Sequence, residues 1–340
     1  MNTQTGLVTV FGYGPTGQAT AERLLARGTP VRIVQRKRPE NLPTGATFMA
    51  CDVLNADDVK CALAGAQQAV ITIGFEYSGK AWRSKWPRAM ENFLAAAEAA
   101  NVRIVHIDNM YMYGPQDEPV HEDMPLTSHG VKPSVRAQVT RMWQKAAREG
   151  RVRWAALRAP DFYGPGVMLS HLGATGLARV AQGKSAQLLM EPDIPHAFAY
   201  VPDIGRAAVT LLDAPDSAFN QAWHVPCAPT RTPRDLLRMG AEAAGVDLKL
   251  MSIPSWLLRV LGVFSGSMRE YAEMRFTWNR PYHVNAAKFA RRFWSDATPF
   301  DIGIPAAMRS YPAAEPKPSR KAGAAEKTTK SGGRTPAAAR

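Results

Sequence analysis

Short apolar runs alternate with amphipathic stretches over the first half of the chain. The runs have the length and β-branched content of buried strands, and the stretches between them carry apolar residues at helical spacing. Predicted strands span residues 7–11, 31–34, 47–50, 69–73, 103–107 and 153–157, and predicted helices span residues 16–27, 56–63, 86–100 and 139–149. This alternation predicts an α/β fold with a doubly wound parallel sheet.

Beyond residue 160 the pattern becomes irregular, and glycine, proline and aromatic residues are frequent. We therefore expect a dinucleotide-binding domain over residues 1–160 and a smaller C-terminal substrate-binding region over residues 161–312. The second region is expected to return partly to the sheet, at about Phe198–Val201 and Trp223–Val225. Residues 313–340 have almost no apolar side chains to bury, so they are predicted to form a disordered basic tail.

The composition is that of an ordinary globular protein, with 340 residues, 46% hydrophobic and 21% charged. Cys51, Cys61 and Cys227 show neither a CxxC pair nor metal-ligand spacing, so we expect reduced thiols, no metal site and a cytoplasmic location. No signal-peptide pattern opens the chain, and no apolar stretch approaches the ~20 residues of a membrane span. We therefore expect no membrane partner.

The net charge of +13 is unevenly distributed. Residues 313–340 contain seven Lys or Arg and two Glu, which gives +5 and leaves +8 for the rest (13 minus 5). The rest contains no recognisable nucleic-acid-binding module, so a nucleic-acid partner is not expected. A DNA-binding role of the tail alone is the alternative, and it predicts binding that weakens steeply with salt.

The turn after the first predicted strand has the spacing of a dinucleotide-binding loop. Gly12 permits the tight turn, Gly14 lets the backbone approach a pyrophosphate, and Gly17 lets the helix pack closely on the strand. The following helix offers free N–H groups to phosphates at its N-terminus. The predicted cofactor loop comprises Gly12, Tyr13, Gly14, Pro15, Thr16 and Gly17. The sheet is therefore predicted to be of the Rossmann type.

The end of the second predicted strand bears on the choice of cofactor. It reads Gln35-Arg36-Lys37-Arg38, where an NAD-specific site would have an acidic residue for the ribose hydroxyl. Arg36 can form a charge-assisted fork with a 2′-phosphate, so NADP(H) is favoured over NAD(H). Asp52 and Val53, after the third strand, are expected to contact the adenine; a helix cap or turn is the alternative role for Asp52.

Several motifs in order resemble the extended, epimerase/dehydratase-like branch of the short-chain dehydrogenase/reductase superfamily, over residues 5–305. They are the glycine loop, Asp52-Val53, NMYMYGP at 109–115, RAPDFYGPG at 158–166 and YVPDI at 200–204. The resemblance implies an NAD(P)-dependent oxidoreductase, epimerase or dehydratase that acts on a small molecule. It also implies a homodimer.

The chain departs from this family at the catalytic residues. The family uses Ser or Thr followed by Tyr-x-x-x-Lys, whereas here Asn109 stands at the Ser/Thr position, and Lys132 and Arg136 stand at the Tyr and Lys positions, just before a helix. Arg136 can hold the nicotinamide ribose but cannot act as a base. Lys132 can donate a proton if it is desolvated and close to Arg136, because a neighbouring cation lowers an ammonium pKa.

Tyrosines on the loops after the fifth and sixth strands are the other candidates. Tyr111 is the first choice as catalytic acid because it lies two residues beyond Asn109 and shares its face if the chain is extended. Tyr113 and Tyr163 are expected to contact the substrate, although each could instead pack against its own loop.

Other polar residues rank lower. His196 and His224 are each more typical of satisfied surface or core histidines, and Asp203 is expected to cap a helix over residues 204–212. Since the Tyr-x-x-x-Lys pair is missing, the alternative function is a non-catalytic NADP(H)-binding sensor or regulatory protein.

Overall fold

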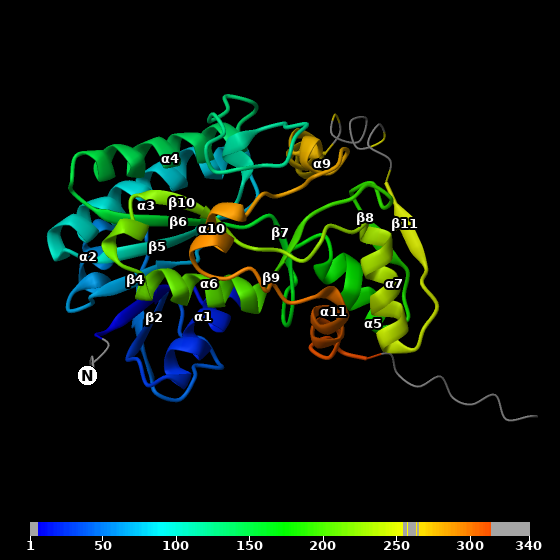
Figure 1. Ribbon diagram of the computed structural model, residues 1–340, viewed down its shortest axis with the longest axis horizontal. Coiled ribbons are helices and arrows are strands. Elements are labelled where there is room, and N and C mark those ends of the chain that lie inside the picture. Colours follow the sequence, from blue (N-terminus) through cyan, green and yellow to red (C-terminus); the bar gives the residue numbers. More distant parts are fainter. Residues whose placement is uncertain (1–5, 254–256, 258–262, 264, 314–340) are drawn as a thin grey trace, which may run out of the picture.

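A seven-stranded sheet forms the centre of the computed structural model, which describes residues 6–253, 257, 263 and 265–313 (Figure 1). All six strand pairings are parallel, in the order β10-β6-β5-β4-β1-β2-β3. The strands are β1 (Val8–Phe11), β2 (Val31–Gln35), β3 (Ala46–Ala50), β4 (Gln68–Ile71), β5 (Arg103–Asp108), β6 (Arg153–Arg158) and β10 (Gln221–His224). This is the predicted Rossmann-type doubly wound sheet. Residues 314–340 of the predicted tail lie outside the described residues.

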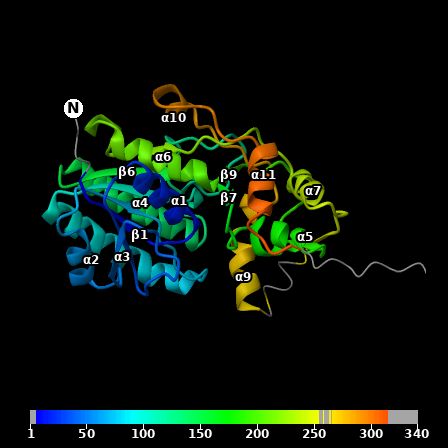
Figure 2. The same ribbon diagram turned by 90° about the horizontal axis from the view of Figure 1, so that it is seen from below.

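Helices cover both faces of this sheet (Figures 1 and 2). One face packs against α1 (Pro15–Ala26) and α6 (Val201–Asp213), which bury Leu24 and Ile204 against the strands. The opposite face packs against α2 (Ala56–Leu63), α3 (Gly79–Ala100) and α4 (Lys132–Arg148). Because both faces are covered, the strands carry continuous apolar runs rather than alternating ones.

The second region lies beyond the carboxyl ends of the strands (Figures 1 and 2). It holds two small parallel pairs, β7 (Asp161–Tyr163) with β9 (Phe198–Tyr200) and β8 (Ala186–Leu188) with β11 (Leu250–Ser252). Its helices are α5 (Ala178–Ala181), α7 (Pro233–Ala244), α9 (Gly266–Glu273), α10 (Ala287–Arg292) and α11 (Phe300–Met308). Short turns of helix are η1 (Tyr111–Tyr113), the π-helical η2 (Gly173–Leu177), η3 (Asp216–Ala218) and η4 (Arg275–Thr277).

Two helices begin earlier than predicted. Helix α3 starts at Gly79 rather than near residue 86, with the Ser78 hydroxyl accepting a bond from the Ala81 N–H, and it continues through Pro87. Helix α4 starts at Lys132 rather than at residue 139. The expectation that residues 132–136 precede the helix is therefore wrong: they form its first turns, where a proline is tolerated.

Two expectations about the second region are also wrong. Strand β9 pairs with β7 and not with the seven-stranded sheet, whereas β10 does join the sheet beside β6. Asp203 does not cap α6, which begins at Val201. Instead the buried Asp203 carboxylate accepts bonds from the Thr298 N–H at 2.7 Å and from its hydroxyl at 3.0 Å, which fastens the C-terminal segment to α6.

Candidate active site

The glycine loop joins β1 to α1 and is closely packed at Gly12 and Gly17. Gly12 has φ +89°, which favours glycine, and a Cβ at Gly17 would overlap the carbonyl oxygen of Gly12. The Thr72 hydroxyl, after β4, lies 2.9 Å from the carbonyl oxygens of both Phe11 and Gly12. A Cβ at Gly14 would meet nothing within 4 Å, so the backbone is open on that side. The loop therefore has the close packing and the open approach that a pyrophosphate requires.

Gln35 connects this loop to the basic segment after β2. Its side-chain carbonyl accepts a bond from the Tyr13 N–H at 3.2 Å, and its amide donates to the Lys37 carbonyl at 2.8 Å. Arg36, Lys37 and Arg38 are exposed. Gln35 thus stands where an NAD-specific site would have an acidic residue, and its neutral side chain is already hydrogen-bonded within the protein. Three cationic side chains follow it in the chain.

Asp52 makes a turn in this structure. Its carboxylate accepts a bond from the Leu54 N–H at 3.0 Å, and the cap of α2 is Asn55. Val53 is half-buried, and its carbonyl accepts a bond from the Asn92 amide at 2.9 Å. The adenine contacts of Asp52 and Val53 stay predictions.

Asn109 begins the turn that follows β5. Its side-chain carbonyl accepts a bond from the Tyr111 N–H at 3.0 Å, and its own N–H donates to Asp108 at 2.7 Å. The same Asp108 carboxylate pairs with Arg136, whose guanidinium is buried and lies 4.1 Å from the centre of the Trp86 ring. Within the described part of the chain, Nε and Nη1 of Arg136 have no hydrogen-bond partner. Arg136, the residue predicted to bind the nicotinamide ribose, is therefore held in place by Asp108, and its Nε and Nη1 atoms remain available as donors.

Lys132 lies between two carboxylates of α9. Its ammonium pairs with Glu270 at 2.5 Å and with Glu273, and it lies 4.8 Å from the centre of the Tyr77 ring. Its side chain is fully buried. The condition for a proton-donating Lys132 was a neighbouring cation, but the partners found here are anions. The ion pairs of Lys132 thus differ from the neighbouring cation that proton donation was expected to need.

Tyr111 lies among aromatic rings at the carboxyl end of β5. Its ring stacks on Trp82 with 6.0 Å between centroids, and Tyr77 lies nearby. Burial raises the pKa of the Tyr111 hydroxyl well above its usual value, and the negative charge of Asp161 raises it further. Tyr111 is thus a poor base at neutral pH.

Tyr113 and Tyr163 are both fully buried. The Tyr113 hydroxyl accepts a bond from Arg158 and lies 2.8 Å from Nε2 of His224, and burial lowers the pKa of His224 to about 3. Tyr163 packs between Tyr200 and Phe300, with 5.3 Å between ring centroids on each side. The Tyr113 hydroxyl is thus occupied by protein groups, and the substrate contacts of both tyrosines stay predictions.

The structure also brings together a pair that the sequence did not single out. Nε2 of His196 lies 2.9 Å from Oδ2 of Asp161, close to Tyr111. Asp161 stands in the motif at 158–166, and a carboxylate three residues beyond the end of a strand was the signal available for it. Its histidine partner lies 35 residues further along the chain, so only the fold reveals the pair.

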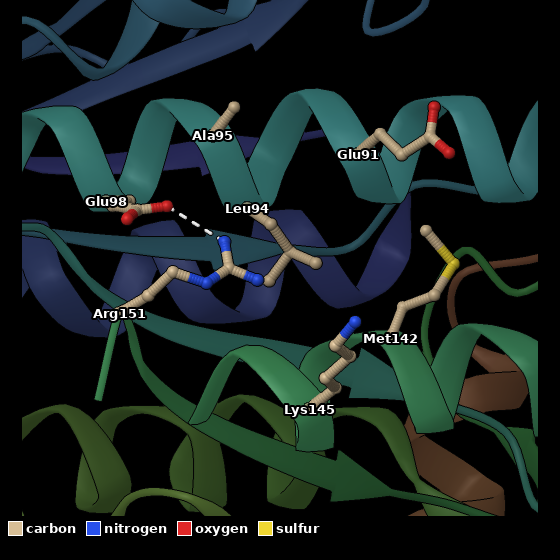
Figure 3. Close-up of a pocket in the computed structure, with 7 residues that line it drawn as sticks. All are labelled: Glu91, Leu94, Ala95, Glu98, Met142, Lys145 and Arg151. Atoms are coloured by element: carbon tan, nitrogen blue, oxygen red, sulfur yellow. Dashed lines mark hydrogen bonds and ion pairs between the residues drawn. The ribbon is translucent and has the colours of Figure 1, made fainter. Parts of the chain in front are cut away.

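A cavity of about 260 Å³ lies elsewhere, between α3 and α4 (Figure 3). Its lining is Glu91, Leu94, Ala95, Glu98, Met142, Lys145 and Arg151, with Arg151 paired to Glu98 at 2.9 Å. None of the predicted site residues lines it. Within residues 6–253, 257, 263 and 265–313, no group of three or more side chains is arranged to hold a metal ion. No helix of the described chain is both long and apolar enough to cross a membrane.

A model of the NAD dependent epimerase/dehydratase family matches residues 8–225. The chain belongs to this family. It is therefore an enzyme of the epimerase/dehydratase type that uses an NAD(P) cofactor, as the resemblance implied. No curated protein matches the chain.

Three solved enzyme structures have a fold similar to that of this chain. UDP-glucose 4-epimerase from Thermus thermophilus, in complex with NAD, is 19% identical, with a TM-score of 0.70 over 89% of this chain and 98% of that one. The enzyme WbmH from Bordetella bronchiseptica, in complex with NAD+, is 17% identical, with a TM-score of 0.71 over 90% and 98%. UDP-glucuronic acid 4-epimerase from Bacillus cereus, in complex with NAD, is 13% identical, with a TM-score of 0.71 over 89% and 98%.

Proposed function

We propose that this epimerase/dehydratase-family enzyme binds NADP(H) in preference to NAD(H) and acts on a hydroxyl-bearing small molecule. The observation that supports the preference for NADP(H) is the end of β2, where the neutral Gln35 is followed by the exposed Arg36, Lys37 and Arg38. A 2′-phosphate placed there meets cations and no carboxylate, and Arg36 can bind it through two N–H groups.

The proposed cofactor contacts follow the carboxyl edge of the sheet. The glycine loop holds the pyrophosphate, Asp52 and Val53 lie toward the adenine, and Arg136 offers Nε or Nη1 to the ribose near the nicotinamide. When bound, the dinucleotide supplies a hydride acceptor or donor. Arg136 also positions the loop after β5, because Asp108 joins its guanidinium to the N–H of Asn109.

Sugar nucleotides are the proposed first class of substrate. Structures of this fold include enzymes named for UDP-glucose and UDP-glucuronic acid. UDP-glucose and UDP-glucuronic acid are therefore the first probes for turnover with NADP+ and NAD+. A homodimer is proposed on the family resemblance, and light scattering of the purified chain should give twice the mass of one chain.

Replacing Arg36 tests the cofactor proposal. Arg36→Glu is expected to weaken NADPH binding about 10- to 100-fold, because a charge-assisted hydrogen bond worth ~1.5–3 kcal/mol is lost and a repulsion is added. NADH binding should change by less than about threefold, because NADH has no 2′-phosphate. Fluorescence titration of both reduced cofactors gives the two dissociation constants.

Lys184→Glu makes the same charge change at an exposed position in the second region and should leave both constants unchanged. Wild-type protein that binds NADH as tightly as NADPH would contradict the proposed preference. Tight NADPH binding with no turnover of either sugar nucleotide would instead contradict the proposed substrate class.

A further inference from the structure

Tyr111 and Asp161 occupy equivalent places beyond two neighbouring strands. Strands β5 and β6 pair in register, with Asp108 opposite Arg158, and each of the two residues lies three positions further along its chain. Ligands of open parallel sheets bind beyond the carboxyl ends of the strands. The Tyr111 and Asp161 side chains therefore belong to the place where the substrate of this enzyme is expected.

Asp161 is bound to His196, which precedes β9. The carboxylate Oδ2 lies 2.9 Å from Nε2 of the imidazole, and the two side chains are 18% and 2% exposed. The ring stacks on Tyr282 with 5.1 Å between centroids and an interplanar angle of 18°. Its second nitrogen, Nδ1, is buried and has no hydrogen-bond partner among the residues that the structure describes. A buried polar atom without a partner is costly, so a ligand group that reaches Nδ1 would remove that cost.

The carboxylate decides which nitrogen of the neutral ring carries the proton. Burial by itself raises the pKa of Asp161, but its hydrogen bond with His196 holds it below its usual value. Asp161 is then an acceptor only, so Nε2 of His196 carries the proton and Nδ1 is left as a free acceptor. Asp161 thus orients the imidazole as a carboxylate orients the histidine of a nucleophile–base–carboxylate triad.

Titratable groups face this pair from each neighbouring segment. His171 lies on the loop after β7, and burial lowers its pKa. Tyr111 faces the pair from η1 and Tyr282 from the segment after η4, and burial raises the pKa of both hydroxyls well above the usual value. Both tyrosines therefore stay protonated near neutral pH and serve as hydrogen-bond donors rather than bases.

The two replacements of Tyr-x-x-x-Lys are poorly placed to exchange a proton with a substrate. Arg136 does not deprotonate, and the buried Lys132 side chain is engaged in ion pairs with Glu270 and Glu273. A general acid–base works best when its ordinary pKa is near the working pH, which an imidazole provides. His196 has the required free nitrogen and an orienting carboxylate.

We propose that His196, oriented by Asp161, is the catalytic residue that takes and returns the hydroxyl proton of the substrate. In the oxidising direction Nδ1 accepts the proton as the O–H bond breaks, and the electron pair of that bond becomes the second C–O bond. The hydrogen on the same carbon leaves with its electron pair, as hydride, to an oxidised nicotinamide dinucleotide. The imidazolium formed is stabilised by the Asp161 carboxylate, and reduction reverses each step. The proposal rests on the proposed function.

The tautomer of His196 is testable without any substrate or cofactor. Nitrogen NMR of the full chain with labelled histidine, assigned by comparison with His196→Asn, reports which ring nitrogen carries hydrogen at pH 9, where histidine rings are neutral. We expect hydrogen on Nε2 and none on Nδ1, and we expect Asp161→Asn to weaken this preference. Hydrogen on Nδ1 in the wild-type protein would overturn the proposal, because the proposed acceptor would be occupied.

Kinetics test the proton transfer itself. With NADP+ and UDP-glucose or UDP-glucuronic acid, His196→Asn should lower kcat about 100-fold or more, and Asp161→Asn about tenfold or more, with the NADPH dissociation constant unchanged. The fall of kcat/KM at acid pH, where a protonated imidazole cannot accept the proton, should disappear from the residual activity of His196→Asn.

His129→Asn is the control, since it removes an exposed imidazole that has no part in the proposed site and should change kcat less than about threefold. Full kcat in His196→Asn, or an equal loss in His129→Asn, would overturn the proposal. If neither sugar nucleotide is turned over, the NMR measurement of the His196 tautomer decides whether the proposal holds. Absence of NADPH binding in the wild-type protein would contradict the proposed function instead. The tautomer of His196 could still be measured in that case, because the NMR experiment needs no cofactor.

Discussion

A methyl group added at Gly14 meets open space, whereas one added at Gly17 meets backbone. Gly14 has φ −74°, an ordinary value for any residue, and nothing lies within 4 Å of the position that its Cβ would take. At Gly17 the Cβ would overlap the carbonyl oxygen of Gly12 and crowd the Thr72 hydroxyl. One glycine of the loop is therefore required by the fold, and the other leaves space for a ligand.

Alanine at these two positions separates stability from cofactor binding. Gly17→Ala should lower the free energy of unfolding by about 1–3 kcal/mol, because the helix must move away from the strand. Gly14→Ala should leave it within about 0.5 kcal/mol but weaken NADPH binding about tenfold or more, because its methyl group occupies the path of the pyrophosphate. Urea unfolding and fluorescence titration measure the two quantities. Equal NADPH affinity in Gly14→Ala and wild type would show that the pyrophosphate does not pass this residue.

At the scale of elements, α9 connects the beginnings of two helices, and it lies beside the junction of the two regions in both views (Figures 1 and 2). Glu270 accepts bonds from the N–H of Gly79, the first residue of α3, at 2.9 Å. Glu273 accepts bonds from the N–H groups of Val131 and Lys132 at the start of α4. Carboxylates at helix N-termini are favourable, so α9 fastens the second region to α3 and α4. Lys132 neutralises both carboxylates.

Removing the Lys132 ammonium should therefore destabilise the protein. Lys132→Met is expected to lower the free energy of unfolding by about 3 kcal/mol, because two partly buried carboxylates lose their shared cation. Lys145→Met on the same helix is the control: its side chain is 70% exposed and its ammonium lies 3.9 Å from Glu149, so the change should be below about 0.5 kcal/mol. Urea unfolding at pH 7.5 compares the two variants. Equal stability of Lys132→Met and wild type would show that α9 does not depend on this cation.

At the scale of the whole molecule, two histidines are buried in the central sheet as neutral rings. Burial lowers the pKa of His106 on β5 to about 4 and that of His224 on β10 to about 3, from an ordinary 6.5. Below pH 6.5 the unfolded chain binds protons at both rings while the folded chain does not. The folded state therefore loses stability as the pH falls from about 6.5 toward these lower values.

Acid sensitivity near pH 5 follows from these two rings. The free energy of unfolding should fall by about 3–4 kcal/mol between pH 7.5 and pH 5, at up to about 1.4 kcal/mol per pH unit for each ring. Urea titrations at the two pH values measure it. His106→Asn should remove about half of this pH dependence, and the exposed His129→Asn should leave it unchanged. A constant free energy of unfolding over this range would show that both rings become protonated in the folded state.

The fold was predictable because its signals are local. The strand lengths, the spacing of Gly12, Gly14 and Gly17, and the apolar helix positions depend on neighbouring residues, and most element positions follow the pattern. The start of α4 was missed because its beginning is set by contact with Glu273, more than a hundred residues away. The surroundings of the predicted site residues were harder to predict for the same reason, since Lys132 receives its charge environment from α9.

The sequence by itself determined the Rossmann-type sheet, the glycine loop after β1, the basic end of β2 and the missing Tyr-x-x-x-Lys pair. Each of these features depends on residues that are close together in the chain, and their chemistry does not depend on distant partners. Only the tertiary structure decided which polar groups are free: it binds Lys132 to two carboxylates, joins Tyr113 to His224, and brings His196 to Asp161. Burial and long-range pairing set the protonation of these side chains, and both arise only when distant segments pack together.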